Sequence, residues 1–236
     1  MTHKRRKLSL ILAITLSLIA ISWVICQTTG ILRYSKMAAG SCSPALKPGD
    51  RFFMSNLVTP KRFDLIGFKQ TDPFTQEEGI WIFRLCGLPG ETVEFRNGDL
   101  YVNGKTIDAH LDLKHPYFAP AKFSLRIKEL AGIEDTDDML LTSISMDSII
   151  VYLDRSVAAK LRREKIPCRR NILSPFDPDT QIDDQYKHNW NQDNFGPYTI
   201  PANHYFVLGD NRNQAQDSRY IGAIPVESFA GTVLNP

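Results

Sequence analysis

Residues 91–104 read ETVEFRNGDLYVNG, and this stretch decides how the folded part of the chain is interpreted. Apolar and polar side chains alternate through 91–96 and again through 99–102, which is typical of half-buried β-strands. Between these runs, Asn97-Gly98 suits the two positive φ angles of a tight hairpin turn. A second Asn-Gly dipeptide follows at 103–104. The stretch therefore predicts antiparallel β-structure.

Other short apolar or alternating runs extend this prediction on both sides. We expect strands at 51–58, 63–68, 80–86, 91–96, 99–102, 204–208 and 229–234. The first five predict an antiparallel meander. From 106 to 198 the sequence is polar and uneven, with helices expected from about Ser124 and around 156–165. We therefore predict a mainly β core built from 37–105 and 199–236, with 106–198 inserted as an α/β or irregular subdomain.

The N-terminal segment predicts a membrane anchor. Residues 8–26 are nineteen positions without a charge, close to the ~20 residues that cross a hydrocarbon core. The basic tail at 1–7 should stay in the cytoplasm, which places the C-terminal mass outside. A cleavable signal peptide is the competing interpretation, but the sequence after the apolar stretch lacks the small-x-small cleavage pattern. Bulky Ile25 argues against a lipid-modified Cys26.

Composition argues against nucleic acid as a partner and against a metal or organic cofactor. Six of the 28 Lys and Arg residues precede Met37, which leaves 22 basic residues against 26 acidic ones in the rest of the chain. A nucleic-acid-binding protein usually concentrates basic charge on its folded domain, so nucleic acid is not an expected partner. The four cysteines, Cys26, Cys42, Cys86 and Cys168, form no CxxC pair. A bridge between Cys42 and Cys86 stays open, and no metal or organic cofactor is expected.

Four blocks follow the anchor in a fixed order. They are GSCSPAL at 40–46; PGD at 48–50 with KRFDLIGF at 61–68; RLCGLPGETV at 84–93 with LYVNG at 100–104; and GDNR at 209–212 with DSRYIG at 217–222. Together they resemble the bacterial type I signal peptidases, membrane-anchored serine proteases that remove signal peptides from exported proteins. The resemblance covers most of the chain outside 106–198.

This resemblance implies an antiparallel β catalytic domain in which a serine attacks the peptide carbonyl and a buried lysine accepts its proton. Ser41 takes the position of the nucleophile, and its backbone N–H is a donor for the oxyanion. Asp217 and Arg219 match residues that support the site in this family. The family's groove favours an extended segment ending in Ala-x-Ala.

The pattern breaks at the base. Phe83 occupies the position just before Arg84 where the family carries its lysine, and a phenyl ring cannot accept a proton. Ala215 stands where many members carry a serine that binds this lysine, and Ala39 where some carry an oxyanion-hole serine. The changes at 83 and 215 indicate an apolar refilling of the base pocket, because an unpaired buried hydroxyl costs stability and an alanine does not.

Other residues could replace the missing base. The candidates by residue type are Lys36, Lys47, Lys69 and His204. Each also has an ordinary explanation as a solvated or turn residue. Cys42, beside the serine, is a weaker candidate for a replacement nucleophile, since it occupies the family's methionine position and suits packing.

Two functions remain open from the sequence. One is a signal peptidase I-like membrane serine endopeptidase that removes signal peptides, with its standard dyad in doubt because of Phe83. The other is a catalytically impaired, membrane-tethered homologue that binds signal peptides or an active companion peptidase. Both place a single-pass protein in the bacterial inner membrane, with the bilayer and signal-peptide-bearing exported proteins as partners.

Overall fold

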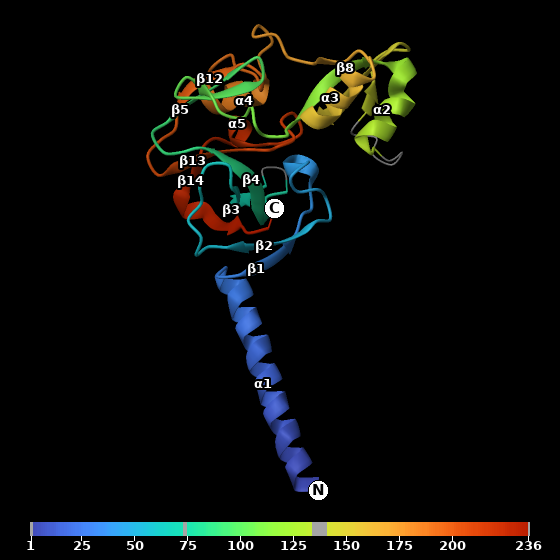
Figure 1. Cartoon of the computed structure of the whole chain (residues 1–236). Coiled ribbons are helices and arrows are strands. Elements are labelled where there is room, and N and C mark those ends of the chain that lie inside the picture. The colour runs from blue at the N-terminus through green and yellow to red at the C-terminus, as the bar shows by residue number, and fades with distance from the viewer. Residues whose placement is uncertain (1, 73–74, 134–140, 236) are drawn as a thin grey trace.

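The computed structural model of the protein describes residues 2–72, 75–133 and 141–235. Helix α1 (Thr2–Thr29) extends away from a β-rich body as a single rod (Figure 1). Within α1, Lys7–Thr29 is long and apolar enough to cross a membrane, and 0% of its most apolar window is buried in protein. Exposed apolar side chains on this scale need an apolar medium, so α1 suits a membrane anchor.

The largest sheet is antiparallel throughout. In spatial order its strands are β1 (Arg33–Lys36), β2 (Arg51–Ser55), β15 (Phe229–Val233), β3 (Leu65–Thr71), β4 (Glu78–Gly87), β13 (His204–Leu208) and β14 (Ile224–Pro225). The predicted strands are present, and the mainly β fold class is confirmed. The expected five-strand meander is wrong after residues 80–86, because β4 pairs with β13 and the strand predicted at 91–96 belongs to another sheet. It is also wrong between β2 and β3. The C-terminal β15 lies between them, since Thr232 faces Ser55 on one side and Ile66 on the other.

A second antiparallel sheet contains the stretch that predicted the fold. Its strands, in spatial order, are β12 (Phe195–Thr199), β5 (Thr92–Arg96), β6 (Asp99–Val102) and β7 (Lys105–Thr106). Asn97 and Gly98 join β5 to β6 with φ angles of 52° and 78°. These are the left-handed conformations that a tight hairpin turn requires. The predicted hairpin is confirmed.

A third sheet carries two helices and a core of its own. Its strands, in spatial order, are β11 (Arg169–Arg170), β8 (Lys114–Pro120), β10 (Ser148–Asp154) and β9 (Leu141–Ser143). The predicted helices are present as α2 (Ser124–Ala131) and α3 (Arg155–Arg163). Ile127, Val151 and Leu161 are buried together in this core. In Figure 1, α2, α3 and β8 lie at the end of the body away from α1.

The division of the chain at 106 and 198 stays a prediction. Strand β12 lies mostly inside 106–198 yet pairs with β5 of the core segment. The remaining short elements are α4 (Thr180–Tyr186), α5 (Ser218–Ile221) and the 3-10 turns η1 (Gly40–Cys42), η2 (Ala121–Phe123) and η4 (Val226–Ser228).

The two cysteines that the sequence left open for a bridge are both buried and both free. The thiol of Cys42 instead donates to the carbonyl of Ile82, with 2.9 Å between Sγ and O. This bond fixes η1 against β4, next to the position that the sequence analysis assigned to the base.

Candidate active site

Ser41 lies at the centre of η1 and is half-buried. Its carbonyl accepts a hydrogen bond from the backbone N–H of Asn211 at 3.0 Å. Ala39 precedes the turn in an extended conformation, with φ −116° and ψ 160°. The turn is therefore held on two sides, by Cys42 against β4 and by Ser41 against the segment after β13.

Three predicted site residues meet around Gly209. A Cβ atom at Gly209 would fall 2.3 Å from Cβ of Ala215, 2.7 Å from the carbonyl oxygen of Ser41 and 3.6 Å from Cε1 of Phe83. The first two distances are shorter than real Cβ contacts, so the backbone approach requires glycine here. The structure thus brings Ser41, Phe83 and Ala215 together, as the motif matching predicted.

Phe83 occupies the position expected for the base, and its side chain has no atom that can accept a proton. It is 4% exposed and belongs to the main apolar cluster together with Met37 and Ala215. Its ring centroid lies 5.9 Å from that of Phe68 and 6.2 Å from that of Trp81, the latter in an edge-on arrangement. Aromatic pairs at these separations stabilise a core beyond the area they bury. Phe83 therefore packs in the apolar core and offers Ser41 no proton acceptor.

Asp217 and Arg219 form a buried ion pair beneath the site, with side chains 0% and 1% exposed. Arg219 Nε donates to Asp217 Oδ1 at 2.9 Å, and Arg219 Nη2 to Asp217 Oδ2 at 2.8 Å. Asp217 Oδ2 also accepts the backbone N–H of Gly209 at 3.0 Å. The pair therefore holds the glycine around which the site is built.

Arg219 ties the same region to more distant backbone. Its guanidinium donates to the carbonyls of Gln192, at 3.0 Å, and of Arg212. Burial acts to lower the pKa of Arg219, but the charge and hydrogen bonds of Asp217 outweigh it and raise the pKa above its usual range. Neither residue is among those that line the two cavities beside Ser41, and a supporting role for the pair stays a prediction.

Sequence reasoning missed a second, partly buried ion pair near the site. Arg84 donates to Asp210 through Nε at 2.7 Å and Nη2 at 2.5 Å, and its Nη1 donates to the carbonyl of Phe63 at 2.5 Å. This two-pronged geometry is among the stronger ionic contacts in proteins. Arg84 follows Phe83 directly and Asp210 follows Gly209, so the motif blocks contained the signal. The pair connects β4 to the segment around Gly209.

Two cavities open beside Ser41. The apolar cavity, of about 550 Å³, is lined by Ser35, Lys36, Met37, Ala38, Ala39, Ser41, Phe52, Met54, Asp72, Gly79, Ile80, Trp81, Ile82, Phe83, Gln214 and Gln216. The lysine cavity, of about 540 Å³, is lined by Ala39, Gly40, Ser41, Ser43, Lys47, Pro48, Lys114, Ala131, Gly132, Ile133, Asn211 and Gln214. Ser41, Ala39 and Gln214 belong to both, so the serine stands at their junction.

The candidate replacement bases differ in whether they line a cavity beside Ser41. Lys36 lines the apolar cavity and Lys47 the lysine cavity. Lys69 lines neither, and His204 lies at the start of β13 with Nδ1 2.9 Å from the carbonyl of Ala202. Lys114, which the sequence analysis did not consider, lines the lysine cavity. Burial raises the pKa of the Cys42 thiol well above its usual range, so Cys42 is not an activated nucleophile.

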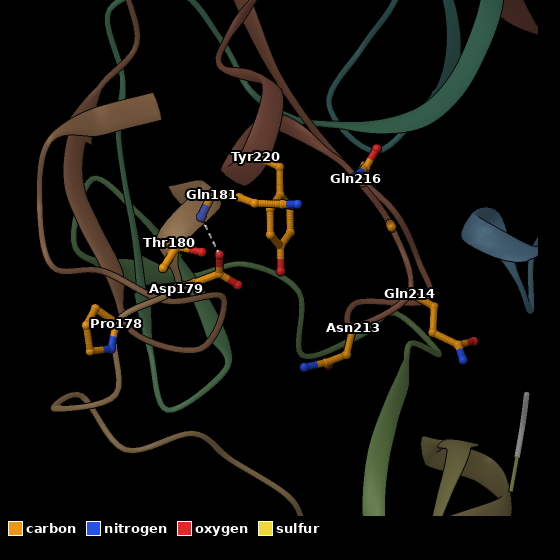
Figure 2. Close-up of a pocket in the computed structure, with 9 residues that line it drawn as sticks. Pro178, Asp179, Thr180, Gln181, Asn213, Gln214, Gln216 and Tyr220 are labelled. Carbon is orange, nitrogen blue, oxygen red and sulfur yellow. Dashed lines mark hydrogen bonds between the residues drawn. The ribbon is translucent and has the colours of Figure 1, made fainter. Parts of the chain in front are cut away.

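A third cavity, of about 630 Å³, lies beyond the loop that carries Ala215 and is polar (Figure 2). On one wall Asp179 accepts the N–H of Gln181 at 2.9 Å, and the ring of Tyr220 stands beside them. Burial raises the pKa of Tyr220 to about 12. Within 2–72, 75–133 and 141–235, no group of three or more His, Cys, Asp or Glu residues could hold a metal ion.

A family model described as "Signal peptidase, peptidase S26" matches residues 8–236. The chain belongs to this family. The order of the blocks around Ser41, Arg84 and Asp217, which suggested the family from the sequence, agrees with this match. The family assignment is therefore confirmed, while the roles of individual site residues remain predictions.

Named relatives support the same assignment. Signal peptidase I of Buchnera aphidicola subsp. Baizongia pistaciae (strain Bp) is 26% identical over 218 residues, covering 82% of this chain and 66% of that protein. Signal peptidase I S of Bacillus subtilis (strain 168) is 28% identical over 153 residues, covering 64% of this chain and 48% of that protein. The chain thus spans under two thirds of the first relative's length and about half of the second's.

A solved structure is also similar. The crystal structure of a signal peptidase I from Enterococcus faecalis V583 is 22% identical in sequence, with a TM-score of 0.35. The match covers 75% of this chain and 98% of that chain.

Proposed function

We propose that this protein binds the signal peptides of exported proteins in the apolar cavity and that Ser41 cleaves them slowly, without a lysine base. The observation that supports this most directly is the position of Ser41, half-buried at the junction of two cavities and fixed through Asn211 and Cys42. A serine whose backbone is held in this way is positioned for a peptide carbonyl that enters from either cavity, and such positioning contributes to acyl transfer.

The binding mode follows from the edge of the large sheet. Strand β1 is an edge strand, and the apolar cavity is lined by Ser35 and Lys36 at its end and by Met37 directly after it. An extended peptide can add to such an edge through main-chain hydrogen bonds while alternate side chains enter apolar pockets. Ile82 and Met54 give the cavity the apolar character that small residues before a cleavage site require. The Ser41 backbone N–H is the oxyanion donor in this proposal.

Phe83 sets the rate in this proposal. General-base assistance typically contributes about 10²-fold to 10⁴-fold, so Ser41 beside an apolar base position should react slower by roughly that factor. The same observation favours a second candidate function: a membrane-tethered module that binds signal peptides or an active companion peptidase and does not cleave. The buried packing of Phe83 and Ala215 is what supports this alternative.

The membrane placement belongs to the proposal as well. Lys4, Arg5, Arg6 and Lys7 precede the apolar part of α1, and basic flanks tend to stay in the cytoplasm. The body would then lie on the extracytoplasmic face of the bacterial inner membrane, where signal peptides emerge. A single-pass anchor would hold the cavities near the bilayer surface.

The test is cleavage of an Ala-x-Ala preprotein by the full-length protein in detergent, compared with Ser41→Ala. We expect slow product formation over hours that Ser41→Ala abolishes. Equal background rates in the two proteins, with preprotein binding retained, would reject cleavage and favour the binding module. Loss of preprotein binding in both would reject both candidate functions.

A further inference from the structure

We propose that the end of α1 is locked to the body, and that this junction sets the minimum spacing at which Ser41 can act on a signal peptide. The spacing is the number of residues between the apolar segment of the peptide and its Ala-x-Ala sequence. The inference rests on the proposed function and its membrane placement, because it names a substrate feature that the same site would select. The junction, called here the α1 joint, is made by Gln27, Thr29 and Gly30 at the helix end, Tyr34 in β1 and Asn56 after β2.

Gln27 holds β1 against the last turn of the helix. Its Oε1 accepts the N–H of Tyr34 at 2.7 Å, and its Nε2 donates to the carbonyl of Tyr34 at 3.4 Å. Nε of Arg33 donates to the carbonyl of Gln27 at 3.3 Å. The chain between α1 and β1 consists only of residues 30–32. Because one side-chain amide pairs with both main-chain groups of Tyr34 across so short a link, it fixes the direction in which β1 leaves the helix.

The loop after β2 holds the helix end at a second place. The N–H of Asn56 donates to Gly30 O at 3.0 Å, and its Nδ2 donates to Thr29 O at 2.9 Å. Ser55 Oγ donates to Ile31 O at 2.5 Å. Gly30 ends the helix with φ 78°, and a Cβ atom there would fall 3.1 Å from Nδ2 of Asn56. Carbonyls at a helix end have no partner within the helix, so bonds from the body both satisfy them and tie the helix down.

Two attachments on different strands leave the body little freedom to swing on α1. In Figure 1, α1 meets the body at the end where β1 and β2 lie. Apolar side chains beside the α1 joint are exposed, with Ile31 at 41% and Leu57 at 72%. Exposed apolar side chains next to a membrane-spanning helix suit the bilayer surface. The α1 joint would therefore lie at that surface and hold the body at one angle to it.

A fixed angle gives Ser41 a fixed height above the bilayer. Strand β1 leads from the α1 joint to the apolar cavity, which Ser35 and Lys36 at its end line. At roughly 3.3 Å per residue, the strand advances about 13 Å, and Ser41 follows shortly after it. Ser41 is therefore on the order of 10 to 20 Å from the α1 joint. A signal peptide that leaves the bilayer beside α1 needs about three to six extended residues to cover that distance.

The length of the spacer then affects binding in one direction. A shorter spacer reaches Ser41 only if apolar residues of the signal peptide leave the bilayer. Exposing a large apolar side chain to water should weaken binding by about tenfold for each residue drawn out. A longer spacer only adds a loop, and the cost of closing a loop grows slowly with its length. The α1 joint should therefore impose a minimum spacing and no sharp maximum.

The experiment measures occupancy of the site in lipid vesicles and does not depend on catalysis. Full-length Ser41→Ala protein is reconstituted with phosphatidylethanolamine and phosphatidylglycerol. It is mixed with signal peptides whose Ala-x-Ala sequence follows the apolar segment after one, two, four, six or nine residues. A benzophenone at the middle position of Ala-x-Ala reports occupancy as cross-linking yield. We expect the three longer spacers to bind within about threefold of one another, and the shortest at least about tenfold more weakly.

Loosening the α1 joint should lower the minimum spacing. With Gln27→Ala and Asn56→Ala combined, the shortest spacer should bind about as well as the four-residue spacer, because the body can tip towards the bilayer. The matched control is Thr28→Ala, which removes a hydroxyl that donates to the carbonyl of Val24 within α1, and it should keep the original minimum. A second loosened variant keeps both joint side chains and inserts Gly-Ser-Gly-Ser after Leu32. It should lower the minimum in the same way.

The outcomes distinguish this inference from the proposed function. The same minimum in the loosened variants as in the parent protein, or no minimum in the parent, would overturn the inference and leave signal-peptide binding in place. A short Ala-x-Ala peptide without an apolar segment should bind the parent and the loosened variants equally. Weaker binding of this peptide by the variants would mean that the site itself is altered and would overturn the assignment to height. Occupancy no greater than that of a scrambled signal sequence at every spacing would overturn both proposals together.

Discussion

The residues on the two sides of Gly209 differ in how far they match those expected from the family. On one side, Phe83 and Ala215 form an apolar core where this family carries a lysine and its serine partner. On the other, Asp217 and Arg219 retain a buried ion pair that holds the Gly209 backbone. By resemblance to the family, the residues expected to transfer the proton are replaced here, whereas the ion pair expected to support the site is present.

This difference separates two requirements of a serine protease, a stable scaffold around the nucleophile and a base that accepts its proton. A buried ion pair is costly to dismantle one residue at a time, because the partner left behind is an uncompensated charge. A lysine and a serine that only move protons can be exchanged for apolar residues, which pack without hydrogen-bonding partners. The peptide-binding shape around Ser41 can therefore persist when general-base catalysis is lost.

The largest expected effect comes from restoring the missing chemistry. Phe83→Lys combined with Ala215→Ser should raise Ser41-dependent cleavage of an Ala-x-Ala preprotein by about 10²-fold to 10⁴-fold, the usual contribution of a general base. Burial at this position would lower the pKa of the new amine and keep it neutral enough to accept a proton.

The matched control is Phe83→Met with Ala215→Ser, which introduces a flexible side chain without an amine. It should show no gain in rate. If the lysine variant folds, binds the preprotein and still shows no gain, the base position is not what limits cleavage.

A smaller effect, on stability, should come from removing one partner of the buried ion pair between Asp217 and Arg219. Arg219→Met leaves Asp217 buried without its partner, so the free energy of unfolding should fall by about 3 to 5 kcal/mol. Chemical denaturation followed by tryptophan fluorescence measures this. Arg96→Met, which removes the exposed partner of Glu94, is the control and should leave the midpoint nearly unchanged. A similar small change in both variants would mean that the buried pair does not support the fold.

Sequence reasoning predicted the fold class and some of the residues that lie close to Ser41, while the roles of those residues remain predictions. The motif blocks placed Ser41, Phe83 and Ala215 in one site, and the structure gathers all three around Gly209. These residues are far apart in the chain, and they were grouped because the order of the motif blocks resembles that of a known family. The order of strands was predicted less well, since nothing in the local alternation of 51–68 shows that β15, more than 160 residues later in the chain, lies between β2 and β3.

The second cavity beside Ser41 could not be predicted from sequence for a related reason. Lys114 and the end of α2 reach the serine only because β8 bonds to the backbone around Asn211. Lys47 was noted as a possible base by its residue type, whereas Lys114 was not considered. Partners distant in the chain become visible only when the fold brings them together.

The most direct test of the central claim, that Ser41 works without a general base, is the pH dependence of its acylation. An Ala-x-Ala p-nitrophenyl ester is reactive enough to acylate a weak nucleophile, and Ser41→Ala supplies the background rate. Without a base the reaction depends on the serine alkoxide, so the Ser41-dependent rate should rise about tenfold per pH unit from 6 to 9 with no plateau. A plateau within that range would reveal a titrating base at Ser41 and contradict the claim.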